Sequence, residues 1–280
     1  MTTEIALATL PGTPGRRNED FAAATPDAFV VLDGVTPGPD DGCRHGVPWY
    51  VAQLGPRLLT ALTTAPHRSP ADCLAESISA VADLHRDSCD LSVQTTPQAT
   101  VAAGRLTADR VEYLVLADCT LLLDLGGELL AVTDDRVEHV AADLRRAARA
   151  LPEGTPERAA AAARYAAAVA ALRNRPGGFW TAAAEPAVAA EALTGSVERS
   201  AVVALAAMSD GAARFSDVLG LGDHAALMKV LAQHGPAELL DQIRAAEQAD
   251  PERRRHPRGK VSDDATVIHF RRQTGAGGGI

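Results

Sequence analysis

Apolar positions along the chain follow two different spacings, which together predict a fold of strands and helices. Short apolar or alternating runs bounded by turn residues are typical of strands. Apolar residues three and four positions apart indicate amphipathic helices. The predicted strands are 29–32, 99–106, 111–117, 120–124, 128–133, 200–208 and 265–270, with a further strand and turn within 177–192. The predicted helices are 48–64, about 70–87, 138–173 with an interruption at 152–156, 216–234 and 236–248.

The order of these elements bears on the architecture. The strands between 99 and 133 are too closely spaced to be joined by helical crossovers, so we expect an antiparallel sheet there. Ser69 followed by Pro70 is a helix start, because serine caps the first free N–H groups and proline fits the first helical turn. No linker or internal repeat divides the chain. We therefore expect an α+β fold with one domain over 1–272 and a disordered tail over 273–280.

Composition and charge narrow the function classes. The chain has 27 Lys and Arg against 36 Asp and Glu, a net charge of −9, which argues against non-specific nucleic-acid binding. No apolar run is long enough to span a membrane, and the N-terminus lacks the features of a signal peptide. The four cysteines are widely spaced, which favours reduced thiols in a cytoplasmic protein. Cys43 and His45 lie close together, but no further ligand pair is evident, so no structural zinc site is expected.

Acidic residues recur beside the apolar, strand-like runs. Any one of them alone is more typical of an ordinary turn. Carboxylates that converge at the end of a sheet need a counter-charge, and oxygen ligands favour magnesium, manganese or calcium over zinc. These residues are Glu19 and Asp20, Asp33, Asp118, Asp210, and Asp263 with Asp264.

The order of these acidic motifs resembles that of the metal-dependent Ser/Thr protein phosphatases of type 2C, in their bacterial branch. Each motif is weak alone, but the set is collinear between residues 16 and 270. The matching segments are Arg16-Arg17-Asn18-Glu19-Asp20, Val31-Leu32-Asp33-Gly34, Ala99-Thr100 to Gly104, Ala117-Asp118-Cys119-Thr120, Val132-Thr133-Asp134-Asp135-Arg136, Ser209-Asp210-Gly211 and Asp263-Asp264-Ala265-Thr266.

The resemblance implies a four-layer α-β-β-α sandwich of two antiparallel sheets, with two magnesium or manganese ions at one end and a third, weaker one. A metal-bridging water would attack a phosphomonoester. The implied metal ligands are Asp33, which would bridge both ions, Asp210 and Asp263 (or its neighbour Asp264) on the first ion, Glu19, Asp20 and the Gly34 carbonyl on the second, and Asp118 with Asp210 on the third. Arg17, or alternatively Arg16, would bind the phosphate, because a guanidinium matches phosphate with two parallel hydrogen bonds.

Departures from the family pattern leave alternatives open. The segment 35–46 after Asp33-Gly34 is unlike that of many bacterial members, and His45 is the nearest candidate for a general acid. The first hypothesis is a bacterial, cytoplasmic and monomeric phosphatase of phosphoserine and phosphothreonine in proteins. The second is a phosphatase of a small phosphomonoester. The third is a pseudo-phosphatase that binds a partner. Phe179 and Trp180 are candidates for lining a substrate groove, but we favour core packing for both aromatic residues.

Overall fold

Two five-stranded antiparallel sheets pack face to face in a computed structural model that describes residues 3–36, 40–152 and 154–273. One sheet has the order β1-β10-β9-β6-β7, and the other has the order β2-β3-β4-β5-β8. The first contains β1 (Thr3–Leu10), β6 (Thr120–Asp124), β7 (Leu129–Thr133), β9 (Ala204–Met208) and β10 (Ala265–Arg272). The second contains β2 (Phe21–Thr25), β3 (Ala28–Val35), β4 (Gln98–Leu106), β5 (Arg110–Leu116) and β8 (Leu193–Glu198).

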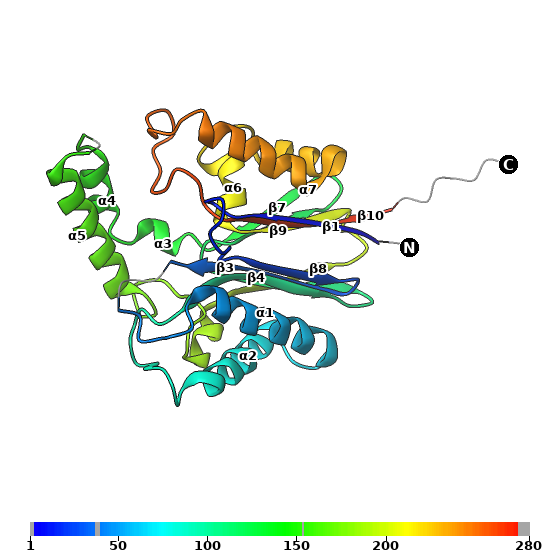
Figure 1. Ribbon diagram of the computed structural model, residues 1–280. Helices are drawn as coiled ribbons and strands as arrows, with labels where there is room; N and C mark the ends of the chain where they lie inside the picture. The colour runs from blue at the N-terminus through cyan, green and yellow to red at the C-terminus, as the bar shows by residue number, and fades with distance from the viewer. Residues whose placement is uncertain (1–2, 37–39, 153, 274–280) are drawn as a thin grey trace.

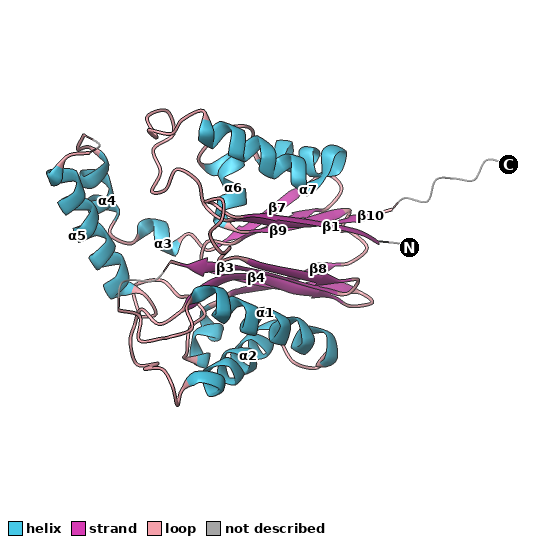
Figure 2. Ribbon diagram, viewed as in Figure 1, coloured by secondary structure: helices cyan, strands magenta, loops and turns pink. Residues whose placement is uncertain are grey.

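Helices cover the outer face of each sheet and complete four layers (Figure 1). Helices α1 (Val47–Thr64) and α2 (Pro70–His85) lie on the β3 sheet, whereas α6 (Asp210–Asp217) and α7 (His224–Gln248) lie on the β9 sheet. The short α3 (Arg136–His139), α4 (Ala142–Arg149) and α5 (Pro156–Leu172) project from one end of the sandwich, as Figure 2 shows. A 3₁₀ turn, η1 (Pro186–Glu191), precedes β8. The expected α-β-β-α sandwich is therefore confirmed.

Side chains of β3 point alternately to its two faces, so this strand contributes to two apolar layers. Phe29 and Val31 face the space between the sheets, where Phe29 meets Phe270 edge-on with ring centroids 5.9 Å apart. Val30 and Leu32 face the opposite way and pack with residues of α1 and α2. Successive strand residues point to opposite faces, so a continuous apolar run marks a strand buried on both sides. This packing fixes the position of Asp33, the next residue along β3.

Several predicted elements need correction. The strands between 99 and 133 do not form one sheet, because β4 and β5 belong to one sheet and β6 and β7 to the other. Strands β1, β2 and β8 were not predicted. The strand predicted within 177–192 is absent from the described residues there, which form only isolated bridges and the 3₁₀ turn η1. The helix predicted over 216–234 is interrupted between Asp217, where α6 ends, and His224, where α7 starts. The expected break between 234 and 236 is present as a kink at Gly235, whose φ is 83°.

Two further expectations concern the chain's extent. The tail predicted over 273–280 lies outside the described residues except for Gln273, and the single domain over 1–272 stays a prediction. None of the helices within the described parts of the chain is long and apolar enough to cross a membrane.

Candidate functional site

Acidic residues from both sheets meet at one end of the sandwich. Asp20 directly precedes Phe21, which pairs with Leu32, and Asp33 directly follows Leu32 on β3. In the other sheet Met208 pairs with both Thr120 and Val267, so that the acidic residues just beyond these strands lie at the same edge. Those residues are Asp118, Asp210 and Asp263. The expectation that strand ends gather carboxylates thus follows directly from the register of the two sheets.

Burial, and to a lesser extent mutual repulsion, disfavours the charged forms of these carboxylates. Burial, followed by the charges of Asp20, Asp210 and Asp118, raises the pKa of Asp33 well above its usual value. Burial is also the main reason why the pKa values of Asp20 and Asp118 rise to about 7. Burial and the charge of Asp263 raise the pKa of Asp210. Such a cluster is stable in its charged form only beside a cation.

One unsatisfied atom supports a cation site. The Asp20 side chain accepts a hydrogen bond from Ser209 Oγ at 2.9 Å through Oδ2, but its buried Oδ1 has no hydrogen-bond partner among the described residues. An unpaired buried carboxylate oxygen is costly, and a bound ion is a common explanation for such an atom. An all-oxygen donor set matches the preference of magnesium and manganese. The residues present therefore fit divalent metal binding.

The neighbours Asp263 and Asp264 have different environments. Asp264 accepts hydrogen bonds from the backbone N–H groups of Gly12 at 2.6 Å and Glu19 at 2.5 Å, which ties the N-terminal loop to the start of β10. Asp263 instead forms ion pairs with Arg214 at 2.8 Å and Lys260 at 2.8 Å. The geometry therefore favours a clamping role for Asp264 and leaves Asp263 beside Asp210.

The basic partners of Asp263 belong to an ion-pair network that the sequence analysis did not identify. Arg214 on α6 also contacts Glu247 at 2.7 Å, and Glu247, fully buried on α7, is held in addition by Arg244 at 2.5 Å. Lys260 donates a second hydrogen bond to Thr36 Oγ1 at 3.0 Å. Arg214 therefore connects helix α7 to the edge of the carboxylate cluster. In the sequence, Arg244 and Glu247 are ordinary charged residues of a predicted helix and Arg214 precedes one, so nothing there indicated that they form a network.

The N-terminal loop brings its own candidates to this end of the sandwich. Glu19 accepts a hydrogen bond from Thr36 Oγ1 at 3.1 Å, which places its carboxylate beside the exit of β3. A Cβ atom at Gly34 would collide with the Glu19 carbonyl and the Val47 side chain, so the loop passes close to β3 only because residue 34 is glycine. Arg16 and Arg17 are both exposed.

The turn around Asp118 links the two sheets. Ala117 has a left-handed backbone with φ of 60°, the conformation that a glycine adopts without strain. The buried carboxylate of Asp134 accepts a hydrogen bond from the Ala117 N–H at 3.3 Å and is held by the Arg136 guanidinium, 2.7 Å away. Asp134 therefore stabilises the turn that presents Asp118. The thiol of Cys119 lies 3.0 Å from Thr100 Oγ1, and burial and the Asp33 charge raise its pKa well above the usual value.

A pocket of about 230 Å³ opens beside the carboxylates. It is lined by Asp118 and Asp210 and by the charged side chains of Glu138, Arg149 and Asp217. The pocket therefore lies between the cluster and the segment of α3 and α4 that projects from the sandwich.

The two aromatic residues that could have lined a groove, Phe179 and Trp180, pack against the protein interior. Phe179 is buried, and the Arg173 guanidinium lies 5.5 Å from its ring centroid. Trp180 is partly buried against the α1 and α2 core. Core packing is thus confirmed for Phe179 and is the main environment of Trp180.

The sequence showed no further ligand pair for Cys43 and His45, but the structure places one beside them. The structure brings His85 and Cys89 to the same place, so that one ligand atom from each of the four side chains lies within 4.8 Å of the others. The signal in the sequence was a pair of short motifs, Cys-x-His and His-x-x-x-Cys, separated by a long stretch of chain. His45, the candidate for a general acid, is directed toward these cysteines, with Nδ1 at 3.4 Å from Cys89 Sγ.

Among comparisons with known proteins, the one with solved structures supports the fold. No family model matches the chain, and no curated protein matches it. Among solved structures, the catalytic domain of serine/threonine protein phosphatase PstP in complex with two manganese ions is similar over 96% of this chain and 97% of its own, with 17% identity and a TM-score of 0.58.

Two other solved structures give similar values. The serine/threonine phosphatase PstP/Ppp of Mycobacterium tuberculosis covers 97% of this chain and 99% of its own at 15% identity and a TM-score of 0.57. Serine/threonine phosphatase Stp1 of Staphylococcus aureus covers 98% and 96% at 14% identity and a TM-score of 0.57. The resemblance to type 2C phosphatases indicated by the sequence motifs is therefore confirmed at the level of the fold.

Proposed function

We propose that the chain is a metal-dependent phosphomonoester hydrolase that acts on phosphoserine and phosphothreonine in proteins. The observation that carries the proposal is the convergence of Asp20, Asp33, Asp118, Asp210 and Asp263 at one end of the sandwich. The burial and mutual repulsion of these carboxylates support it, as does the likeness of the fold to a phosphatase whose structure holds two manganese ions.

The roles proposed for the residues follow the sequence motifs. Asp33 would contact two ions, with Asp210 and Asp263 on one of them and Glu19, Asp20 and the Gly34 carbonyl on the other. Asp118 and Asp210 would hold a third, weaker ion. Two divalent ions supply positive charge to the phosphoryl oxygens and lower the pKa of bound water.

The chain's own side chains have the remaining tasks. Arg17, with Arg16 as the alternative, would pair with the phosphate dianion from the exposed N-terminal loop. Arg214 would keep the Asp263 carboxylate oriented, because the buried Glu247 holds the Arg214 guanidinium in place. Asp264 would keep the Glu19 segment against β10 through its bonds to the backbone. These contacts support a site that is arranged before any substrate arrives.

A second candidate function has one observation in its favour. The Asp263 carboxylate is already paired with both Arg214 and Lys260, which partly neutralises a proposed metal ligand. A pseudo-phosphatase that keeps the fold and binds a partner would tolerate such pairing. Manganese calorimetry separates the two, because the enzyme requires tight binding that Asp210→Asn abolishes, whereas a degenerate site gives no such isotherm.

The substrate class is tested with the purified chain and manganese. Released phosphate is measured for a panel of phosphoserine and phosphothreonine peptides and, in parallel, for small phosphomonoesters. The proposal predicts turnover of the peptides. Exclusive turnover of a small ester would instead identify a small-molecule phosphatase, and the absence of any turnover from manganese-bound protein would overturn the enzyme proposal.

A further inference from the structure

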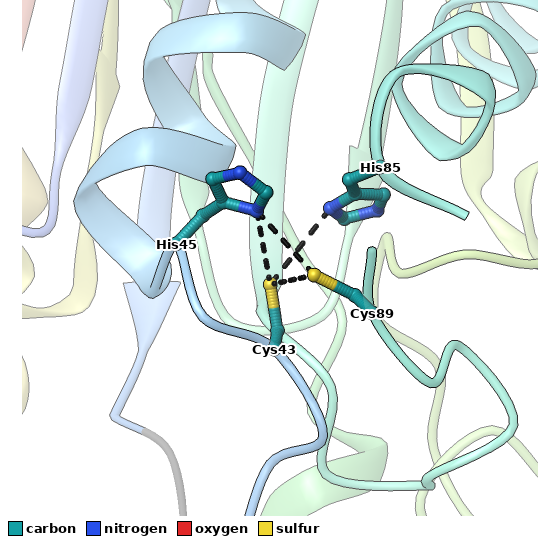
Figure 3. Close-up of side chains that lie close together, drawn as sticks. All are labelled: Cys43, His45, His85 and Cys89. Atoms are coloured by element: carbon teal, nitrogen blue, oxygen red, sulfur yellow. Dashed lines mark hydrogen bonds between the residues drawn. The ribbon is translucent and has the colours of Figure 1, made fainter. Parts of the chain in front are cut away.

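Four side chains on the α1 and α2 side of the molecule form a second cluster of potential metal ligands. Cys43 and His45 come from the loop that leads into α1, whereas His85 ends α2 and Cys89 follows it (Figure 3). All four point toward one another in Figure 3. One ligand atom from each of these four described residues lies within 4.8 Å of the ligand atoms of the other three.

Four of the six separations between ligand atoms are close to those of a tetrahedral ligand set. Cys89 Sγ lies 3.4 Å from Cys43 Sγ and 3.4 Å from His45 Nδ1. Cys43 Sγ lies 3.7 Å from His45 Nδ1 and 3.8 Å from His85 Nδ1. Around a tetrahedral zinc ion with bonds of about 2.3 Å to sulfur and about 2.0 Å to nitrogen, neighbouring ligand atoms are about 3.3 to 3.8 Å apart. The four measured distances fall within or at the edge of this range.

Backbone contacts hold the two ligand-bearing loops together. The Asp90 N–H donates to the Gly42 carbonyl at 2.9 Å, which joins the residues next to Cys89 and Cys43. Gly42 has a φ of 70°, and a Cβ there would lie 2.7 Å from the Asp90 carbonyl oxygen, so the close approach requires glycine. The Cys89 N–H donates to the His85 carbonyl at 2.9 Å, which folds the second motif into a single turn.

The two imidazole rings are fixed by an aromatic neighbour. Trp49 on α1 stacks on His45 with ring centroids 4.3 Å apart and on His85 with centroids 5.0 Å apart. His85 is itself buried. Rings held in this way lose little conformational freedom when they bind a ligand, as is typical of metal sites supported by surrounding packing.

We propose that Cys43, His45, His85 and Cys89 bind one zinc ion in a structural site. Two sulfur and two nitrogen donors form the ligand set that zinc prefers over magnesium or manganese. Four protein ligands leave no open position for water or substrate, so the role is structural. A disulfide between the cysteines would not account for two imidazoles directed at the same point.

The consequence of zinc binding concerns the segment just before α1. The site joins residues 43–45 to the end of α2, and these residues lie between the last residue of β3, Val35, and the first residue of α1, Val47. Zinc would therefore fix residues 43–45 at the entry to helix α1. This is the segment in which the sequence departs from the bacterial phosphatase pattern. The zinc proposal does not depend on the proposed phosphatase activity.

The first test measures metal content by mass spectrometry after dialysis against metal-free buffer. Wild type is expected to retain one zinc per chain, and Cys43→Ser and His85→Asn are expected to lose it. Two matched controls are expected to keep the zinc. Cys73→Ala alters a cysteine of α2 that is buried in the hydrophobic core, and Asp210→Asn alters the carboxylate cluster. Zinc that persists in the Cys43 variant, or that disappears in the Asp210 variant, would overturn the assignment.

A second test needs no variant. The wild-type protein is unfolded in denaturant, stripped of metal, refolded under reducing conditions and titrated with cobalt. The proposal predicts intense visible bands of tetrahedral cobalt together with a thiolate charge-transfer band, both lost on adding one equivalent of zinc. The absence of a thiolate band would contradict the proposal, as would a Cys43–Cys89 disulfide found by counting thiols in the purified protein. Neither readout depends on phosphatase activity.

Discussion

The buried carboxyl of Asp20 should make the metal-free protein less stable as the pH rises. Its side chain is 9% exposed, and burial is the main cause of a pKa of about 7 instead of 3.8. A folded-state pKa above the unfolded value means that the folded protein binds the proton more tightly. The contribution of this carboxyl to the free energy of unfolding is therefore fully present below about pH 4 and is lost as the pH rises to about 7.

The size of the effect follows from the difference between the two pKa values. Each tenfold change in proton affinity is worth about 1.4 kcal/mol, so the full penalty from this one carboxyl is about 4 kcal/mol. Between about pH 5 and about pH 8 the free energy of unfolding should fall by about 3 kcal/mol for this group. Asp20→Asn cannot ionise, so in metal-free buffer at about pH 8 it should be more stable than wild type.

The assay is urea unfolding followed by circular dichroism at both pH values, after dialysis without chelator so that thiolate-bound zinc is retained. Excess manganese should reverse the order, because the ion stabilises the charged wild-type cluster and not the variant. Asp27→Asn, which alters an exposed carboxyl in the β2–β3 turn, is the control and should follow wild type. An Asp20→Asn variant less stable than wild type at the higher pH, in metal-free buffer, would refute the reasoning.

Three further substitutions test the scaffold by urea unfolding. Glu247→Gln removes the buried charge that holds Arg214 and should cost about 3 kcal/mol, and an unchanged midpoint would contradict a structural role for the pair. Ala117→Gly should stabilise the protein by about 1 kcal/mol because it relieves a left-handed alanine, whereas a loss of stability would show that the turn is not strained. Ser69→Ala removes the capping box of α2 and should cost about 1 kcal/mol, and no change would mean that the cap is not formed in solution.

Local signals in the sequence were sufficient for elements whose ends are defined by their own residues. Ser69 and Pro70 predicted the start of α2, and the structure shows Ser69 capping that helix. The break at Gly235 before Pro236 was predicted for the same reason. Strand β1 was missed because it pairs with β10, at the far end of the chain, and its own residues carry little strand signal.

Long-range arrangement was harder to predict from residues alone. The strands on either side of Asp118 looked like one meander, yet Ala117 adopts a left-handed backbone at the turn where the chain crosses from one sheet to the other. The carboxylates were found because each lies next to a strand end, and sheet register then brings them together. The Cys43 and Cys89 motifs were not joined because only tertiary structure shows that the two loops meet.

The account's central claim is tested most directly by hydrolysis of para-nitrophenyl phosphate by the purified chain. The assay compares added manganese, metal-free buffer and the Asp210→Asn variant, with Asp27→Asn as the matched control. The account predicts turnover that requires manganese, is lost in Asp210→Asn and is retained in Asp27→Asn. Folded protein that binds manganese but shows no turnover, or turnover that persists in Asp210→Asn, would contradict it.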